Sequence, residues 1–202
     1  MALGLADLVR NGTMSAEIGA TLTAAVEARR SFLVFAVPRL AGKSTVMEAM
    51  LARASRETPI RWMTGHPTEI ARLRSGDGRG YVVIPEISQY PVMPGYIWGA
   101  PVRRVFSLLD QGHALAAALH APGVHEAFDA VCRGCGVPDE QASRIALAVY
   151  VRSLGDWQAP AARRVAEVHQ ILRVAAGVPE VRLLHRWDEA TDRFVTPPKV
   201  PS

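Results

Sequence analysis

Four consecutive residues, Gly42-Lys43-Ser44-Thr45, have the types and the order that bind phosphate. An apolar run at residues 32–37 precedes them, and apolar residues at helical spacing follow them. This context predicts a strand, a turn and a helix whose first N–H groups and dipole favour an anion. Lys43 would reach the β- and γ-phosphates of a nucleotide, and the Ser44 hydroxyl would bind Mg²⁺. Gly42 and Thr45 are the remaining candidates of the tetrapeptide for contact with the phosphates.

The loop before this tetrapeptide is poor in glycine. A full phosphate-binding loop has glycine five positions before Gly42, where this chain has Val37. Pro38 follows and has no N–H to donate, while Arg39 is a further candidate for contacting phosphate. We therefore expect weak nucleotide binding, and a chance tetrapeptide in a strand–turn–helix remains the alternative. A scarcity of lysine favours function, because the chain has 23 basic residues and its only other lysine is Lys199.

A second candidate is Glu86, which ends the apolar segment 81–85 (YVVIP). A carboxylate at the end of a buried strand can hold Mg²⁺ through water or activate an attacking water. Glu86 is therefore a candidate both for catalysis and for the metal. The signal is weak alone, since carboxylates at strand ends are common, and its order after the tetrapeptide strengthens it.

Two histidines frame a later apolar segment, His113 to His120. If this segment is one strand, the two side chains point to opposite faces because they are seven residues apart. One of them could reach an active site while the other packs against the fold. A structural role for both is the alternative.

Length and composition are those of a globular protein. The chain has 202 residues, 49% of them apolar, with a net charge of +4 and an estimated pI of 9.5. No apolar run is long enough to span a bilayer, and no signal peptide is evident, so a cytoplasmic location is expected. The arginines are scattered rather than clustered, so no nucleic-acid partner is expected. Cys132 and Cys135 form a lone C-x-x-C that we interpret as structural.

The order of elements predicts an α/β fold. Strands are expected at residues 32–37, 59–64, 81–85 and 113–120, with helices between them up to about residue 146, which favours a parallel sheet. Residues 1–30 form a helical lead-in, 31–146 the core, 147–195 a small C-terminal β segment and 196–202 a disordered tail. A loop at residues 88–99 carries Tyr90, Tyr96 and Trp98, which could pack on the core or on a ligand.

Taken in order, these motifs resemble the type II/IV secretion and pilus-assembly ATPases, or traffic ATPases, most of all the branch that drives tight-adherence pili. The similar stretches are LADLVRNGTMSAEIGATLTAAVEARR, GKST, YVVIPEI, GHALAAALHA and the closing ARRVAEVHQILRV, VPEVRLLHRWD and RFV. The resemblance implies a RecA-like P-loop NTPase core, a three-layer sandwich that hydrolyses ATP with Mg²⁺. It assigns catalysis to Glu86 and γ-phosphate sensing to His113 or His120. It also implies a homo-oligomer, a hexamer by resemblance, that docks on an inner-membrane platform protein and lies peripheral to the inner membrane.

Several positions depart from the family pattern. Gly65 and His66 stand where the family has acidic residues, so that only Glu69 remains of its acidic box, and Pro85 replaces a glycine before Glu86. Arg72, Arg74 and Arg79 lie where family arginines act across a subunit boundary. The family's N-terminal domain is not expected here, and a separate chain could supply it. Two alternatives stay open: a degenerate, non-hydrolysing homologue that acts as an assembly or regulatory subunit, and a P-loop nucleic-acid motor.

Overall fold

A computed structural model describes residues 3–38, 40–76, 78–90, 92–156 and 158–198. Within these residues the strands form one nine-stranded sheet in the order β2-β3-β5-β1-β6-β7-β8-β9, and β4 pairs with β3. The strands are β1 Ser31–Ala36, β2 Ile60–Trp62, β3 Tyr81–Ile87, β4 Tyr96–Ile97, β5 Ala114–His120, β6 Ile145–Gly155, β7 Pro160–Ala175, β8 Val178–Asp188 and β9 Arg193–Val195. The helices are α1 Leu5–Arg10, α2 Ala16–Glu27, α3 Lys43–Leu51, α4 Pro67–Ser75, α5 Ala100–Phe106, α6 Val124–Asp129 and α7 Asp139–Ala142.

The first strand is the centre of the sheet. All six residues of β1 are buried, and it lies parallel to β5 on one side and to β6 on the other. Its apolar run therefore fits a strand that is covered on both faces. From β6 onward the pairing becomes antiparallel, through β7 and β8 to β9.

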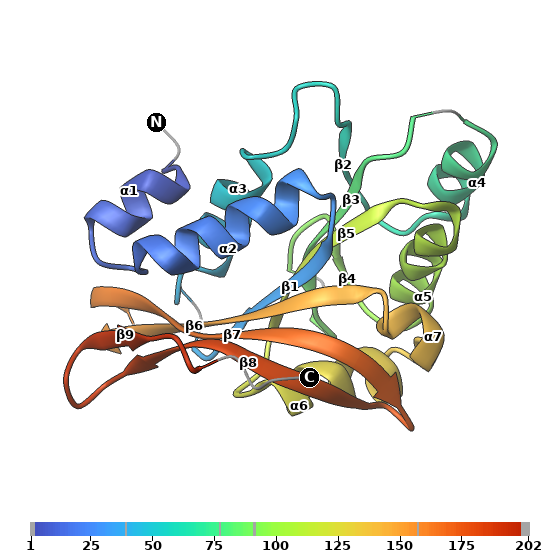
Figure 1. The fold of residues 1–202 in the computed structure, drawn as a ribbon. Helices are drawn as coiled ribbons and strands as arrows, with labels where there is room; N and C mark the ends of the chain where they lie inside the picture. Colours follow the sequence, from blue (N-terminus) through green and yellow to red (C-terminus); the bar gives the residue numbers. More distant parts are fainter. Residues whose placement is uncertain (1–2, 39, 77, 91, 157, 199–202) are drawn as a thin grey trace.

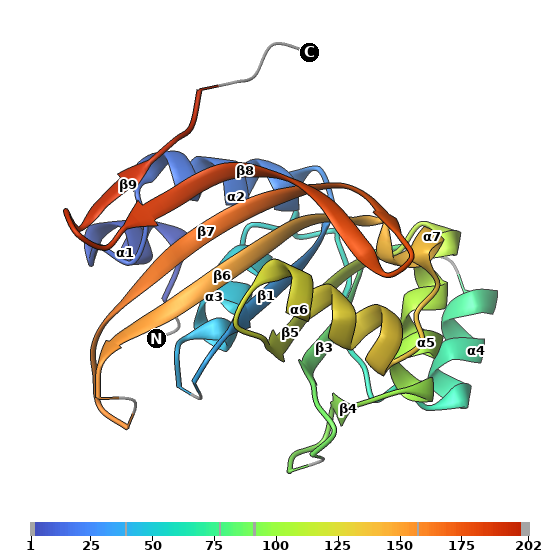
Figure 2. The ribbon, with the colours of Figure 1, turned by 90° about the horizontal axis from the view of Figure 1, so that it is seen from below.

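Helices cover both faces of the sheet (Figures 1 and 2). Phe32 and Val34 of β1 pack with α1, α2 and α3, whereas Leu33 and Phe35 pack with α4, α5 and α6. This division follows from the two-residue period of a strand, which sends neighbouring side chains to opposite faces. The three-layer α/β arrangement that the sequence predicts is confirmed.

The C-terminal strands continue the central sheet. The expected boundary between residues 146 and 147 falls inside β6, which pairs with β1 over its first half. Because β6 also pairs with β7, and β7 with β8, the described part of residues 147–195 forms the antiparallel half of the same sheet. Of the expected tail, residues 199–202 lie outside the described residues, and the Thr196 hydroxyl forms a hydrogen bond with His185 Nδ1 at 2.9 Å.

The helical lead-in is packed onto this antiparallel half. Ser15 caps α2 by accepting from the Ile18 N–H, and the Thr21 hydroxyl lies 2.8 Å from His185 Nε2 on β8. Between α1 and α2, the Thr13 carbonyl accepts a 2.7 Å hydrogen bond from the Val165 N–H of β7. Residues 1–30, as far as they are described, are therefore part of the same folded unit.

Two local details differ from expectation. Within the expected loop 88–99, Tyr96 and Ile97 form β4 and pair with Glu86 and Ile87. The helix expected between the strands at residues 81–85 and 113–120 is α-helical only over Ala100–Phe106 and continues as a 3-10 turn over residues 107–111. A two-residue strand and a change of helix type are both too short to leave a periodic signal in a sequence.

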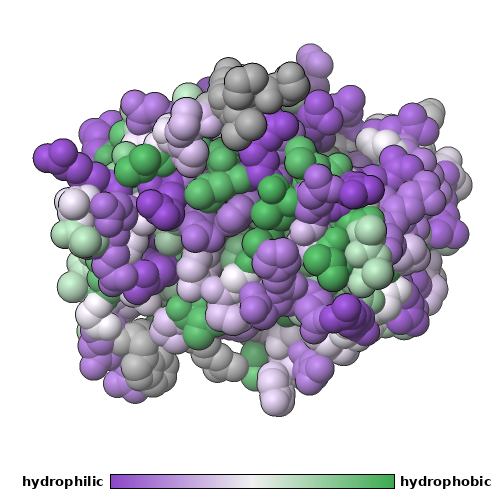
Figure 3. Space-filling model, turned by 60° about the horizontal axis from the view of Figure 1, so that its bottom comes forward, coloured by the Kyte–Doolittle hydropathy of each residue, from purple (hydrophilic) through white to green (hydrophobic). Residues whose placement is uncertain are grey.

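The molecular surface is mixed. Figure 3 shows one face on which hydrophobic residues form several patches with hydrophilic residues between them. Among the described residues, none of the helices combines the length and the apolar character needed to cross a membrane.

Candidate functional site

Lys43, Glu86 and His120 meet at one edge of the sheet. The Lys43 ammonium lies 3.4 Å from Glu86 Oε2, and His120 Nε2 lies 3.7 Å from Glu86 Oε1. Lys43 Nζ is also 3.4 Å and 3.3 Å from the two ring nitrogens of His120. The meeting follows from topology, because β1, β3 and β5 are parallel neighbours and their carboxyl ends lie together. Such edges are where open α/β sheets bind their ligands.

Two members of this cluster are almost inaccessible. The side chains of Lys43 and Glu86 are 7% and 4% exposed, whereas that of His120 is 37% exposed. Two opposite charges removed from water are stable only when they compensate each other. Lys43 and Glu86 therefore form a buried ion pair, and His120 is the member of the cluster that is exposed to solvent.

The phosphate-type loop forms at the start of α3. Gly42 is the N-cap residue with φ +97° and ψ +15°, and its carbonyl accepts from the Val46 N–H at 3.0 Å. The positive φ favours glycine there, and a β-carbon would come within 2.7 Å of Arg163 Cδ and so displace that side chain. The first N–H groups of α3 have no partner within the helix, and Lys43, Ser44 and Thr45 present them to the cleft.

Leu40 takes a left-handed backbone conformation, with φ +63°. This conformation costs a residue with a β-carbon about 1–2 kcal/mol. Residue 40 of the loop thus has a backbone conformation that glycine adopts freely, although this chain has leucine there. The Leu40 side chain is 61% exposed, so it does not offset this cost by packing into the core. Arg39, the remaining candidate in the loop, lies outside the described residues.

A bulge directs Glu86 toward the loop. Ile84 pairs with Ala117 and Ile87 with Leu119, so two residues of β3, Pro85 and Glu86, stand opposite one residue of β5. Proline is tolerated at such an irregularity because it has no N–H to contribute to the ladder. Pro85 in place of the expected glycine is therefore compatible with the position of the carboxylate.

These residues line a cleft of about 860 Å³. It is lined by residues 40–45, by Glu86 and His120, and by residues 87–90, 92, 93, 96 and 98. Trp98 packs against Gly134, where a β-carbon would come within 2.5 Å of the ring, and Tyr90 is exposed. Of these aromatic residues, the tryptophan thus contacts the fold and Tyr90 faces solvent.

His113 lies at the opposite edge of the sheet. It directly precedes β5, and His120 is the last residue of that strand, so roughly 20 Å of extended chain separates them. Burial, together with the nearby positive charges of Arg61 and Arg79, lowers the pKa of His113. The structure therefore brings His120 to the cluster and does not bring His113 there.

The residues that would hold Mg²⁺ with a nucleotide are compatible with that role. Ser44 is exposed in the cleft at the start of α3, and the Glu86 carboxylate lines the same cleft. Hydroxyl and carboxylate oxygens are the ligands that Mg²⁺ prefers, and phosphate and water complete its octahedron. No cluster of three or more His, Cys, Asp or Glu side chains that could hold a metal ion occurs among the described residues.

The residues around the expected acidic box and the trans arginines have local roles. The Glu69 carboxylate accepts from the Thr64 N–H at 3.0 Å and from the His66 N–H at 3.3 Å, and it thereby caps the start of α4. Arg74 donates to the Ser107 hydroxyl at 2.8 Å within the same chain. These contacts place Glu69 and Arg74 in the packing of α4 rather than in the cleft. Arg72 lies on the same helix, and the Arg79 side chain lies against Gly112.

The two cysteines are buried and free. Burial raises the pKa of the Cys132 thiol to about 11, and burial also raises that of Cys135. Thiols with raised pKa values are poor nucleophiles at neutral pH. Both observations favour the structural interpretation of this C-x-x-C.

One cleft residue was not a candidate from the sequence. Arg163, on β7, donates from Nε to the Leu40 carbonyl at 3.2 Å and lines the cleft. It lies 123 positions after Leu40 in the chain, within the closing stretch ARRVAEVHQILRV, to which the resemblance assigns no site role. Only the pairing of β7 with β6, and of β6 with β1, brings it to the loop.

The sheet order, the helices on both faces and the loop at the end of β1 define a RecA-like α/β fold, as the sequence predicts. Solved structures with a similar fold include two ATPases. The VirB11 ATPase of the Brucella suis type IV secretion system, in complex with sulphate, matches 82% of this chain at 15% identity with a TM-score of 0.57. The Legionella pneumophila ATPase DotB matches 85% at 12% identity with a TM-score of 0.55.

This chain spans about half the length of these two proteins, since the matches cover 54% and 51% of them. No protein-family model matches the sequence, and no curated protein sequence matches it either. At identities of 15% and 12%, the structural likeness establishes the fold.

Proposed function

We propose that this chain is the core of a secretion or pilus-assembly motor, which binds ATP with Mg²⁺ and hydrolyses it. One observation carries the proposal: Lys43, Glu86 and His120 converge at the carboxyl edge of a RecA-like sheet, directly beside the start of α3. A lysine, a carboxylate and the N-terminus of a helix in one cleft are the parts that phosphoryl transfer needs. The likeness to VirB11 and DotB supports the motor class.

The roles follow from the chemistry of each group. The N–H groups at the start of α3 and the Lys43 ammonium bind the phosphates, and the Ser44 hydroxyl binds Mg²⁺. The metal neutralises charge on the transferring phosphoryl group when it is bound. Glu86 accepts the proton of the attacking water or orients it, and the solvent-facing His120 contacts the γ-phosphate.

Nucleotide binding changes the partner of Lys43. Before nucleotide binds, its ammonium neutralises Glu86 at 3.4 Å. A triphosphate carries more negative charge than one carboxylate and therefore competes for the ammonium. Once Lys43 turns to the phosphates, Glu86 is left to act on water. The ion pair thus keeps the catalytic carboxylate neutralised until substrate arrives.

The second candidate is a homologue that binds nucleotide weakly and does not hydrolyse it. Pro38 favours this candidate, because it removes one N–H donor from the loop. A lost charge-assisted hydrogen bond lowers affinity by roughly tenfold to a hundredfold. Such a chain would serve as an assembly or regulatory subunit.

By resemblance we further propose a cytoplasmic homo-oligomer, a hexamer, that lies at the inner membrane on a platform protein. The tight-adherence pilus branch is the assignment that the sequence motifs favour.

Phosphate release from Mg-ATP tests the hydrolytic proposal. The parent should release phosphate, and Glu86→Gln should reduce the rate by about 10²–10⁴ because it keeps the shape but removes the base. A matched control is Glu48→Gln, an exposed carboxylate on α3. If Glu86→Gln hydrolyses at the parent rate, Glu86 is only a carboxylate at a strand end. If neither protein hydrolyses ATP but both bind it, the non-hydrolysing candidate replaces this one.

A further inference from the structure

Arg163 lies across the phosphate-type loop of its own chain. Its Nε donates to the Leu40 carbonyl at 3.2 Å, and its Cδ would be 2.7 Å from a β-carbon on Gly42. The side chain therefore lies against the last turn before α3, next to the N–H groups of the first helical turn. It reaches this position from β7, in which it pairs with Ser153 of β6.

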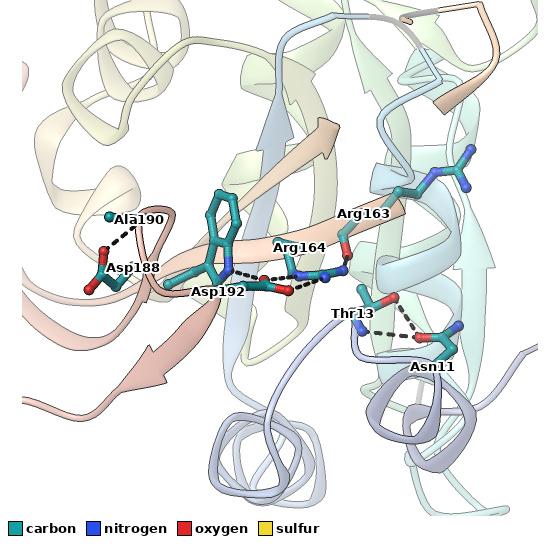
Figure 4. A network of polar contacts seen from close by, with 8 residues as sticks. Asn11, Thr13, Arg163, Arg164, Asp188, Ala190 and Asp192 are labelled. Carbon is teal, nitrogen blue, oxygen red and sulfur yellow. Dashed lines mark hydrogen bonds and ion pairs between the residues drawn. The ribbon is translucent and has the colours of Figure 1, made fainter. Parts of the chain in front are cut away.

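The direction of Arg163 is fixed by its neighbour. Consecutive residues of a strand point to opposite faces, so Arg163 and Arg164 diverge, as Figure 4 shows. Arg164 forms a two-pronged ion pair with Asp192 at 2.8 Å and 2.9 Å, and Asp192 also accepts from Trp187 Nε1 at 2.7 Å. A further nitrogen of Arg164 donates to the Arg163 carbonyl at 3.0 Å. The backbone that carries Arg163 is thus held in place by contacts that do not involve its guanidinium.

Arg163 is one of the cationic side chains that line the cleft. Among the described residues that line it, Lys43 and Arg163 are the two with permanent positive charge. Lys43 is paired with Glu86, whereas the ion pairs formed by the described part of the chain do not include Arg163. Nε is used by the Leu40 carbonyl, which leaves the two terminal nitrogens of the guanidinium fork for another acceptor.

We propose that Arg163 binds phosphate oxygens of the nucleotide held by the same chain. Its two terminal nitrogens match the spacing of phosphate oxygens, which a guanidinium contacts in a two-pronged manner. It compensates for the donor that Pro38 lacks, on the side of the loop where Leu40 and Gly42 lie. This inference rests on the proposed nucleotide-binding function and adds to it a binding residue outside the loop motif.

Calorimetric titration with Mg-ADP and with inorganic pyrophosphate tests the proposal on the full chain. Arg163→Gln keeps a donor for the Leu40 carbonyl but removes the charge, and it should weaken both ligands by roughly tenfold to a hundredfold. Arg163→Lys keeps the charge without the fork and should lie between Gln and the parent. Arg173→Gln is the matched control, since Arg173 lies on the same strand with its side chain 73% exposed and paired with Glu180, and affinity should not change.

The salt dependence of nucleotide affinity distinguishes a direct contact between Arg163 and phosphate from an effect of Arg163 on the conformation of the loop. Because screening weakens a charge contact, parent affinity should fall more steeply with salt than Arg163→Gln affinity. Affinity of Arg163→Gln within twofold of the parent, or an equal loss at low and high salt, overturns the inference. If Lys43→Met abolishes binding in the same series, the proposed function survives that result. If the parent binds neither ligand, both proposals fail.

Discussion

Lys43 and Glu86 form an ion pair at 3.4 Å between two side chains that are almost entirely removed from solvent. The pair joins the first residue of α3 to the carboxyl end of β3. It also joins the two roles of the proposed site, phosphate binding and water activation. Because each charge depends on the other, changing one of them should affect stability as well as binding.

Removing the lysine charge should destabilise the fold. Lys43→Met keeps the aliphatic stem but leaves the Glu86 charge buried without its ammonium, which typically costs about 3–5 kcal/mol of unfolding free energy. The double variant Lys43→Met/Glu86→Gln should recover much of that loss. Urea unfolding measures both effects. The control is Arg53→Met, whose ion pair with Glu27 is exposed, and which should cost less than about 1 kcal/mol. If Lys43→Met and Arg53→Met lose the same unfolding free energy, the buried ion pair stabilises the fold no more than the exposed one.

The left-handed backbone of Leu40 should make glycine acceptable there. Leu40→Gly removes about 1–2 kcal/mol of conformational cost and adds about 0.5–1 kcal/mol of chain entropy, so the free energy of unfolding should stay unchanged or rise by at most about 1.5 kcal/mol. Leu40→Ile should destabilise, because a β-branched residue tolerates a positive φ poorly. Leu172→Gly, at an exposed position near the C-terminal end of β7, should be destabilising in the same thermal-unfolding measurement. A loss at Leu40→Gly as large as that at Leu172→Gly would contradict the assigned backbone.

Stability should fall below neutral pH through His185. Burial between Thr21 and Thr196 lowers the pKa of His185, and Glu17 opposes this only in part. The unfolded chain therefore binds a proton near pH 6.5 while the folded chain does not. The contribution is complete above pH 6.5 and is lost as pH falls toward the folded pKa.

Melting temperatures between pH 8 and pH 5 measure this effect. His185→Gln should flatten the dependence on pH, although His113, whose pKa is also lowered, leaves a remaining slope of the same sign. His125→Gln, at an exposed position of α6, is the control and should leave the slope unchanged. An unchanged slope in His185→Gln would show that this histidine does not couple to folding.

Assembly should depend on nucleotide. The proposed oligomer would hold its nucleotide at a subunit boundary, by resemblance to the traffic ATPases, so a Mg-ATP analogue should raise the mass measured by light scattering. Lys43→Met, which should not bind the analogue, should show no such increase. A monomer at every nucleotide concentration would instead favour a partner chain or the non-hydrolysing candidate.

Much of the layout could be predicted because it depends on local patterns and on one geometric rule. The apolar segments 32–37, 81–85 and 113–120 are typical of parallel strands, and the carboxyl ends of such strands lie at one edge of the sheet. Lys43 follows the first of these strands, Glu86 follows the second and His120 ends the third. The choice between His113 and His120 was not decidable, since both flank the same strand and only its direction in the sheet selects one. Arg163 was not foreseen because long-range strand pairing, which leaves no local signal, brings it to Leu40.

Calorimetric titration of Mg-ATP tests the central claim that this loop and its buried ion pair form a nucleotide site. We predict saturable binding of one nucleotide per chain, loss of that binding in Lys43→Met, and binding at least as tight as the parent in Glu86→Gln, because that variant releases Lys43 from its carboxylate. No binding by the parent, or equal binding by the parent and Lys43→Met, would contradict the account.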